Sequence, residues 1–138
     1  ADIGIMHAAL AKFRQNQNAI FQRPAVILSG GETTVEILGK SGRGGRNTEF
    51  LLAFALSIEN EANITALAAD TDGIDGSENN AGAFCDGNTV IKMREKGFNP
   101  RMHLLKHDAW TIFHAINELF IPGPTGTNVN DFRAILLS

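Results

Sequence analysis

The sequence contains few of the residues that would let it work through disulfides or clusters of thiolates. It has one cysteine, Cys85, among 138 residues. A single cysteine excludes an internal disulfide and a metal site that is built from several cysteines. An unpaired thiol fits a reducing compartment, and we therefore expect the protein to be cytoplasmic.

Two other classes of function are disfavoured by what is missing. No apolar stretch approaches the roughly 20 residues that a helix needs to cross a bilayer, so we expect no membrane role. The 12 basic residues are outnumbered by 15 acidic ones, which gives a formal charge of −3. Because proteins that bind nucleic acids usually carry the opposite balance, we expect no nucleic-acid partner.

What is present is typical of one globular domain. The chain is 43% hydrophobic and 20% charged, which suits a folded protein of ordinary size with a single core. It begins at Ala1 without a methionine. We expect it to be a piece of a longer polypeptide.

Strands and helices alternate along the sequence. Apolar residues at spacings of three and four predict a helix over 2–18, and a short β-branched run predicts a buried strand over 24–29;. Residues 33–38 alternate in polarity, so we expect a strand that pairs with 24–29 as a hairpin. Helices are further predicted at 47–58, 88–96 and after Asp108, and strands at 64–69, 82–85, 119–121 and 132–137. The order predicts an α/β domain with a layered α/β/α architecture, and the hairpin predicts a mixed sheet.

The stretch GKSGRGGRNTEF begins like a nucleotide-binding loop but does not satisfy that motif. A Walker A loop needs a glycine five residues before Gly39, and Thr34 occupies that position;. The dinucleotide pattern G-x-G-x-x-G, counted from Gly42, also fails, because Asn47 stands where the third glycine belongs. Neither standard nucleotide fingerprint is present.

The same stretch nevertheless has the properties of an anion site. Gly44 and Gly45 let the backbone approach a ligand closely, and Arg43 and Arg46 offer planar donors for phosphate or carboxylate. We expect Asn47 to cap the following helix, whose positive end would then face the loop. A surface loop with solvated arginines is an equally good interpretation of these residues alone.

A second loop, ADTDGIDGSENN, gathers carboxylates directly after a predicted strand. Asp72 and Asp75 could hold Mg²⁺ together with water and substrate phosphates, the usual way in which magnesium binds. Asp72 could also act as a base or orient a hydroxyl group. The alternative is that these acids form turn hydrogen bonds and have only a structural role.

A third loop, GPTGTNVND, is rich in uncharged donors. Thr125, Thr127 and Asn128 can form hydrogen bonds with a nucleotide, a sugar or phosphate oxygens. We expect Asp131, at the end of this loop, to support the loop rather than a ligand. A well-satisfied connecting turn is the alternative.

Five stretches, taken in order, resemble one known family. LSGGETTV, GRGGRNTEF, TDGIDG, AGAFCDG and GPTGTNVND occur in the same order in the C-terminal MOFRL domain of the class II glycerate kinases, a family often labelled hydroxypyruvate reductase. On this resemblance residues 24–138 form the MOFRL-like domain, and residues 1–23 form a helix that leads into it. Two positions depart from the family pattern: Asp70 replaces a common glycine, and Ala109 replaces a common serine.

The resemblance implies an activity that this chain would share with a second domain. Family members carry a larger N-terminal Rossmann-like domain, which is absent from these 138 residues, and the active site lies in the cleft between the domains. The reaction implied is the phosphorylation of D-glycerate, or a similar hydroxy acid, to 2-phosphoglycerate, with ATP as co-substrate and Mg²⁺. The isolated chain is then expected to be inactive.

The resemblance also suggests roles for particular residues. Arg46 would stabilise the transferring phosphoryl group, with Arg43 as the second choice, and Asn47 and Glu49 would fix the loop that carries them. Asp72 and Asp75 would lie near the metal or the substrate. The remaining residues expected near nucleotide or glycerate are Gly44, Gly45, Thr125, Thr127 and Asn128.

Two other functions remain open at this stage. The family label suggests an NAD(P)H-dependent hydroxypyruvate reductase, although such an enzyme needs a nicotinamide site. The chain could also be a ligand-binding or regulatory module without catalytic activity.

Overall fold

A computed structural model of the chain describes residues 1–13, 21–32 and 42–138. The strand predicted over 33–38, and with it the predicted hairpin, lies outside the described residues. So do Lys40 and Ser41 of the glycine-rich stretch.

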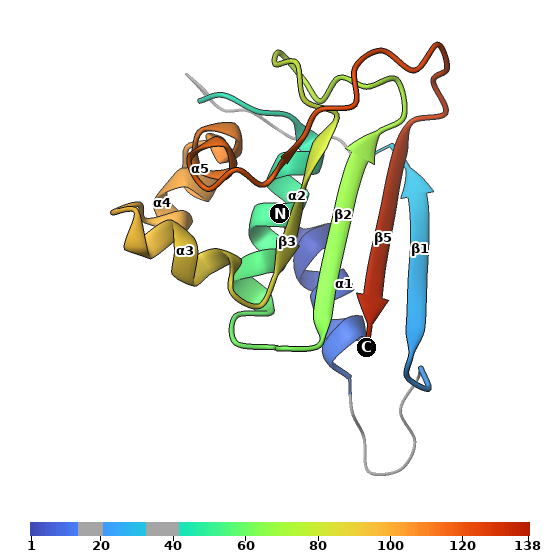
Figure 1. Ribbon diagram of the computed structural model, residues 1–138, viewed down its shortest axis with the longest axis vertical. Coiled ribbons are helices and arrows are strands. Elements are labelled where there is room, and N and C mark those ends of the chain that lie inside the picture. The colour runs from blue at the N-terminus through green and yellow to red at the C-terminus, as the bar shows by residue number, and fades with distance from the viewer. Residues whose placement is uncertain (14–20, 33–41) are drawn as a thin grey trace.

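The described strands form one five-stranded sheet, which Figure 1 shows face-on. They are β1 (Ala25–Gly31), β2 (Ile64–Asp70), β3 (Gly82–Asp86), β4 (Leu119–Phe120) and β5 (Asp131–Leu137). Their order across the sheet is β1-β5-β2-β3-β4, and each neighbouring pair among them is antiparallel. The last strand in the chain, β5, therefore lies between β1 and β2, which run in the same direction.

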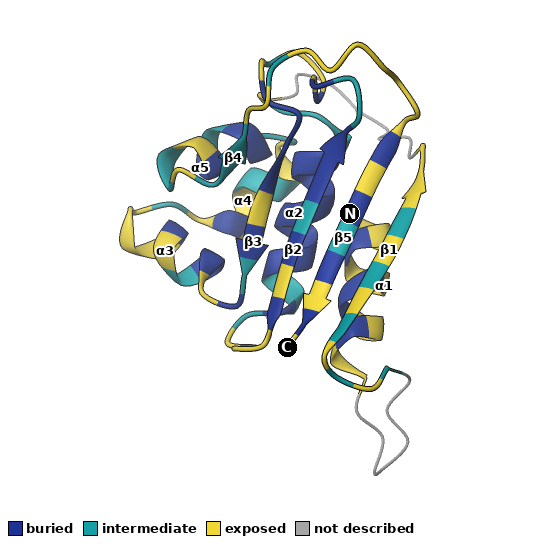
Figure 2. Cartoon of the chain, turned by 45° about the vertical axis from the view of Figure 1, so that its right-hand side comes forward, coloured by how far each residue is buried: buried dark blue, intermediate teal, exposed yellow. Residues whose placement is uncertain are grey.

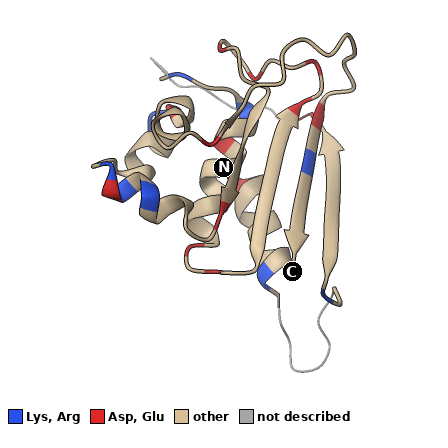
Figure 3. Cartoon of the chain, viewed as in Figure 1, with Lys and Arg blue, Asp and Glu red and all other residues tan. Residues whose placement is uncertain are grey.

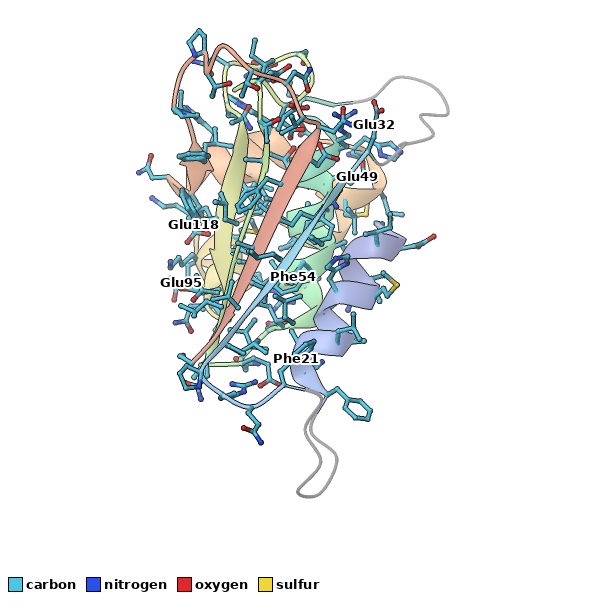
Figure 4. The ribbon with its side chains drawn as sticks, turned by 90° about the vertical axis from the view of Figure 1, so that its right-hand side faces the viewer. Phe21, Glu32, Glu49, Phe54, Glu95 and Glu118 are labelled. Atoms are coloured by element: carbon cyan, nitrogen blue, oxygen red, sulfur yellow. The ribbon has the colours of Figure 1, made fainter. Side chains whose placement is uncertain are left out.

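Helices pack against one face of this sheet. They are α1 (Asp2–Lys12), α2 (Arg46–Ser57), α3 (Thr89–Glu95), α4 (Pro100–Leu105) and α5 (Ala109–Ala115). Helices α1 and α2 lie side by side behind the strands, and α3 to α5 pack on α2 beyond β3 (Figures 1 and 4). Within the described part of the chain, none of the helices is long and apolar enough to span a membrane.

The core lies between the sheet and α2. Leu51 and Phe54 of α2 and Ile135 of β5 are almost completely buried, and burying each such side chain contributes about 1.5–3 kcal/mol relative to exposure. Helix α1 can approach α2 closely because Gly4 has no side chain to meet the carbonyl of Phe50. Cys85 is buried in the same core, and burial raises its pKa well above the ordinary thiol value.

The predicted layered α/β fold is confirmed, with differences in detail. The predicted mixed sheet differs from the described strands, which pair only in antiparallel fashion. A third, helical layer on the far side of the sheet is not formed by the described residues (Figure 4). The physical reason for the first difference is the position of β5: β1 and β2 run in the same direction, but β5 lies between them and pairs with both in antiparallel fashion.

Candidate functional site

The three loops identified in the sequence meet at one end of the sheet, the upper end in Figure 1. Loop 42–45 leads into α2, loop 71–81 follows β2, and loop 121–130 leads into β5. We call this region the site end. The hydrogen bonds that join these segments include Arg43–Glu78, Arg46–Asp131, Asn47–Asp75 and Asn128–Asp72.

Arg46, the first residue of α2, lies at the centre of the site end. Its Nε donates to Asp131 Oδ1 at 2.8 Å, and its terminal nitrogens donate to Asp70 Oδ2 at 2.8 Å and to Glu32 Oε1 at 3.2 Å. Partial burial opposes its charge, but the hydrogen bond and the charge of Asp131, with the charges of Asp70 and Glu32, raise the pKa of Arg46 above its ordinary value. A guanidinium has five N–H donors, so described residues use three of them.

Asp131, the first residue of β5, holds Arg46 through a hydrogen bond between charged groups. Its side chain is fully buried, and Oδ1 also accepts from Asn47 Nδ2 at 2.9 Å. Its other oxygen, Oδ2, accepts from Arg133 at 3.0 Å, and the buried guanidinium of Arg133 lies 5.0 Å from the ring centre of Phe50. Among the described residues, the hydrogen-bond partners of the Asp131 side chain are Arg46, Asn47 and Arg133, so it holds the start of α2 and not the loop 121–130 that we expected it to support.

The start of α2 is capped by Asp75, which comes from a different loop. Asp75 is 1% exposed. Its Oδ1 accepts from the backbone N–H of Asn47 at 3.0 Å, and its Oδ2 accepts from the backbone N–H of Thr48 at 2.9 Å and from the Thr48 hydroxyl at 3.0 Å. Burial raises the pKa of Asp75, while these donors act in the opposite direction. The carboxylate occupies the place of an anion at a helix N-terminus.

This arrangement corrects the predicted cap. Gly45, not Asn47, is the N-cap residue, and Asn47 lies inside the first turn. The prediction was wrong because an Asx side chain near a helix start is read as a local cap, whereas here the cap comes from a residue 28 positions away. We expected the backbone N–H groups at the start of α2 to bind a ligand. Those of Asn47 and Thr48 instead donate to the carboxylate of Asp75.

Asn47 and Glu49 are both buried in the first turn of α2. Asn47 is 1% exposed and bridges Asp75 and Asp131 through its side-chain amide. Glu49 is also buried, and its carboxylate lies 2.7 Å from His107 Nδ1. Both side chains therefore face the protein and not solvent.

Arg43 is held by three different groups. Its Nε and a terminal nitrogen donate to the two oxygens of Glu78 at 2.9 and 2.8 Å, and its guanidinium lies 3.7 Å from the ring centre of Trp110. Its backbone N–H donates to Asp108 Oδ1 at 2.8 Å. The hydrogen bond with Glu78 raises the pKa of Arg43 and lowers that of Glu78. Arg43 is thus fixed in orientation at the surface.

Asp72 is the accessible carboxylate of the acidic loop. It is half-buried. Its Oδ1 accepts from the backbone N–H of Ile74 at 2.8 Å, and from the described residues its Oδ2 receives one long contact, at 3.4 Å from Asn128 Nδ2. Among the described residues, no group of three or more histidine, cysteine, aspartate or glutamate side chains could by itself hold a metal ion.

The third loop is exposed and rests on the acidic loop. Thr125 donates its hydroxyl to the carbonyl of Thr71, so this hydroxyl is used within the fold. Thr127 and Asn128 are exposed. The structure therefore brings all the predicted positions to one end, but only some of them face solvent.

Glycines allow the loops to approach one another. Gly76 has φ +79°, and a side chain there would lie 2.7 Å from the carbonyl oxygen of Gly44. At Gly45 a side chain would collide with the carboxylate of Asp75. The site end is thus closely packed, not a flexible glycine loop.

Gly76→Ala is expected to lower the free energy of unfolding by about 2–4 kcal/mol, since it combines a left-handed backbone with a steric clash. Gly97→Ala is the matched control: its φ is +85°, but nothing lies within 4 Å of the added carbon. That control isolates the backbone cost, expected at about 1 kcal/mol. Urea unfolding of both variants measures the difference, and equal losses would mean that the Gly44 contact is unimportant.

The two departures from the family pattern have different surroundings. Asp70 is part of the Arg46 cluster; burial raises its pKa, as does the charge of Asp72, whereas the Asp72 backbone N–H and Arg46 act against this. Ala109 is 2% exposed and packs in the core. Only the first of these positions can influence the chemistry of the site end directly.

Several residues of the site end were not predicted as site residues from sequence. Glu32 and Arg133 complete the Arg46–Asp131 network, and Trp110 supports Arg43. One signal was available for Arg133, because it is a charged residue at an inward-facing position of an apolar strand. Figure 3 shows the result, with acidic ends of β2 and β5 close to the basic start of α2.

The sequence and the fold match known proteins. The MOFRL family matches residues 25–131. The chain is 48% identical, over 99% of its length, to a protein of Agrobacterium vitis named "Putative hydroxypyruvate reductase", and 40% identical, over 94% of its length, to the glycerate 2-kinase of Pyrococcus horikoshii. It spans only 31% and 29% of those two proteins.

A solved structure agrees with this match. The crystal structure of glycerate kinase from Thermotoga maritima superposes on 99% of the chain with a TM-score of 0.94 and 34% sequence identity. The chain covers 33% of that protein. The curated relatives and this structure are therefore about three times as long as the chain.

Proposed function

The chain belongs to the MOFRL family, and from this premise we propose that it supplies one wall of the catalytic cleft of a glycerate kinase. In the reaction proposed, ATP phosphorylates D-glycerate to 2-phosphoglycerate. The opposite wall comes from the part of a longer polypeptide that lies outside these 138 residues. The names of the relatives and the crystal structure of the Thermotoga maritima enzyme support this assignment.

One observation carries the proposal: three loops that are distant in sequence meet around Arg46. This arginine is held by Asp131 and Asp70 at 2.8 Å each, so its orientation is set before any ligand binds. Phosphoryl transfer depends mainly on positioning and on stabilising charge, and needs no covalent nucleophile. A fixed guanidinium that keeps N–H donors unused by the described residues is suited to that task, and we assign Arg46 to the transferring phosphoryl group.

Arg43 has a secondary place in this proposal. Its bidentate bond with Glu78 and its stack on Trp110 orient it at the edge of the site end. It can contribute positive charge near a nucleotide phosphate, but two of its N–H donors are already bound to the two carboxylate oxygens of Glu78;. The backbone of Gly44 and Gly45 and the exposed groups of Thr127 and Asn128 are the further ligand contacts that we propose.

The acidic residues suit a phosphate that arrives with a cation. Near Arg46 and Arg133, the described residues place four carboxylates: Glu32, Asp70, Asp72 and Asp131. A bare phosphate would be repelled by this surplus. Mg²⁺ usually binds through one or two carboxylates, water and substrate phosphates, and it supplies neutralisation of phosphate charge when bound.

Asp72 is the carboxylate that fits this ion best. It is partly exposed, and among the described residues one of its oxygens has a single, long contact, with Asn128. The same accessible oxygen would suit Asp72 to accept the proton of the glycerate hydroxyl. Asp75 is assigned to the cap of α2, because both of its oxygens accept hydrogen bonds from that helix.

A reductase is the second candidate, favoured by the name of the 48% identical relative from Agrobacterium vitis. Hydride transfer to hydroxypyruvate needs a nicotinamide site. The dinucleotide pattern fails in this sequence at Asn47, which the structure shows to be buried against Asp75 and Asp131. We therefore place this function second.

The test uses the polypeptide from the complete reading frame that contains residues 1–138. We expect ADP release that depends on both D-glycerate and Mg²⁺, with 2-phosphoglycerate identified by ³¹P NMR, and loss of turnover on chelation of the metal. The 138-residue chain alone serves as the control and is expected to show no turnover. Oxidation of NAD(P)H with hydroxypyruvate, without ATP consumption, would instead establish the reductase.

A further inference from the structure

The face of the sheet opposite α1 and α2 is apolar and open. No described helix covers it, and Figure 2 shows exposed residues along β1, β5 and β3 on this side. Its large side chains are between 41% and 64% exposed on β1, β3 and β5. We call this surface the open face; it consists of Val26, Leu28, Leu67, Phe84, Phe120, Phe132, Ala134 and Leu136.

These side chains form one continuous surface. The strand register pairs Val26 with Leu136 and Leu67 with Phe84, and residues paired in this way project from the same side of the sheet. The rings of Phe84 and Phe120 meet edge to face, with their centres 5.3 Å apart. Over the described strands, Asp86 at the end of β3 is the sole charged residue on this side. Monomeric proteins rarely expose apolar patches of more than a few hundred Å².

The pattern of β5 indicates a strand that is covered on both sides. An antiparallel sheet with one face in water alternates apolar and polar residues. In β5 the outward positions Phe132, Ala134 and Leu136 are all apolar, and the polar pair at its start, Asp131 and Arg133, points inward. A strand whose outer side faced water would instead carry polar residues on that side and apolar residues on the inner side.

The width of the open face limits what can cover it. All five described strands contribute, and at a spacing of about 4.8 Å they span about 19 Å. A single helix is about 10 Å across. The occupant must therefore present at least two adjacent apolar helices or an equally broad domain surface.

We infer that the open face is the docking surface for the remainder of the polypeptide, and that the occupant is a broad apolar surface of that remainder. The inference rests on the longer polypeptide of the proposed function, though not on its reaction. The chain spans about a third of each relative, which leaves enough chain outside it to supply such a layer. A surface tethered in the same polypeptide acts at millimolar effective concentration, so it competes well against a second copy. The open face then fixes the two parts together, and the site end remains free for ligands.

Thiol labelling tests this assignment without any need for activity. Leu28→Cys and Leu136→Cys each place a thiol on the open face, and Leu105→Cys, at a residue of α4 that is 74% exposed, is the matched control. Cys85 gives little background, because it is buried with a raised pKa and only the thiolate reacts;. Rates of maleimide labelling are compared between the 138-residue chain and the polypeptide from the complete reading frame, and circular dichroism verifies that each variant folds.

We expect the L28C and L136C thiols to react at least roughly 100-fold more slowly in the complete polypeptide, as groups do when they react only through local opening. The L105C thiol should react equally fast in both forms. Equal rates for L28C in both forms would overturn the inference, as would protection that disappears on dilution, which indicates a second copy. If these thiols were protected in a complete polypeptide that has no kinase activity, the docking inference would hold and the proposed reaction would be wrong.

Discussion

Replacing Arg46 by alanine in the complete polypeptide is expected to lower kcat for glycerate phosphorylation by about 10³-fold or more, as with other arginines that stabilise phosphoryl transfer. The guanidinium is held by three carboxylates in a fixed orientation, so the variant loses a preorganised donor that water cannot replace. If Arg46 acts in the transition state alone, kcat and kcat/KM fall by the same factor. Steady-state kinetics with varied ATP and varied glycerate measures both.

The same substitution also has a structural effect, which must be separated from the catalytic one. Asp70 loses its charged partner, while Asp131 keeps Arg133; we expect a stability loss of about 2 kcal/mol. Arg46→Lys retains the charge but not the planar fork, and it should remain strongly impaired. Added guanidinium ion should partly restore Arg46→Ala, because it replaces the missing group. Full turnover of a folded Arg46→Ala variant would show that this arginine is not used in the reaction.

Replacing Asp75 by alanine is expected to reduce the free energy of unfolding by about 3–4 kcal/mol, among the largest effects of a single substitution. The variant leaves the backbone N–H groups of Asn47 and Thr48 without acceptors in a buried place. Hydrogen bonds to a charged group contribute about 1.5–3 kcal/mol each. Urea unfolding of the 138-residue chain, followed by circular dichroism, measures the loss.

Asp72→Ala is the matched control for this prediction. It removes the same group from the same loop, but Asp72 is half-buried and caps no helix. We expect it to cost about 1 kcal/mol or less. In the complete polypeptide we expect the two variants to rank the other way for catalysis, with Asp72→Ala lowering turnover more than Asp75→Ala. The loss of turnover in Asp72→Ala should also be larger than its small loss of stability explains. If the two variants lost equal stability, the capping role of Asp75 would be refuted.

Much of the local structure could be predicted because it depends on local pattern. The apolar spacing in α2 and the short apolar runs in β1 and β5 predict their conformations directly;. The partners of Asp131 could not be predicted in this way, because its side chain reaches Arg46 and Asn47, which lie more than 80 positions away in the sequence. The resemblance to glycerate kinases came from five ordered motifs, and the match to the MOFRL family agrees with it.

The parts that could not be predicted depend on residues that are far apart in sequence. The cap of α2 joins Asn47 and Thr48 to Asp75. The stack of Arg43 on Trp110 joins loop 42–45 to helix α5. Local patterns contain no information on such partners. For the same reason, Asn47 was assigned as a cap, although the structure buries it between two carboxylates.

By itself, the sequence determined the α/β class, the family, and the three loops that carry polar chemistry. Tertiary structure alone decided that β5 lies between β1 and β2, because strand order depends on which edges meet after the helices pack;. That placement brings Asp131 beside Arg46 and makes the pairing of the sheet antiparallel. It also places the apolar outer side of β5 in the middle of the open face. None of the described helices covers it there.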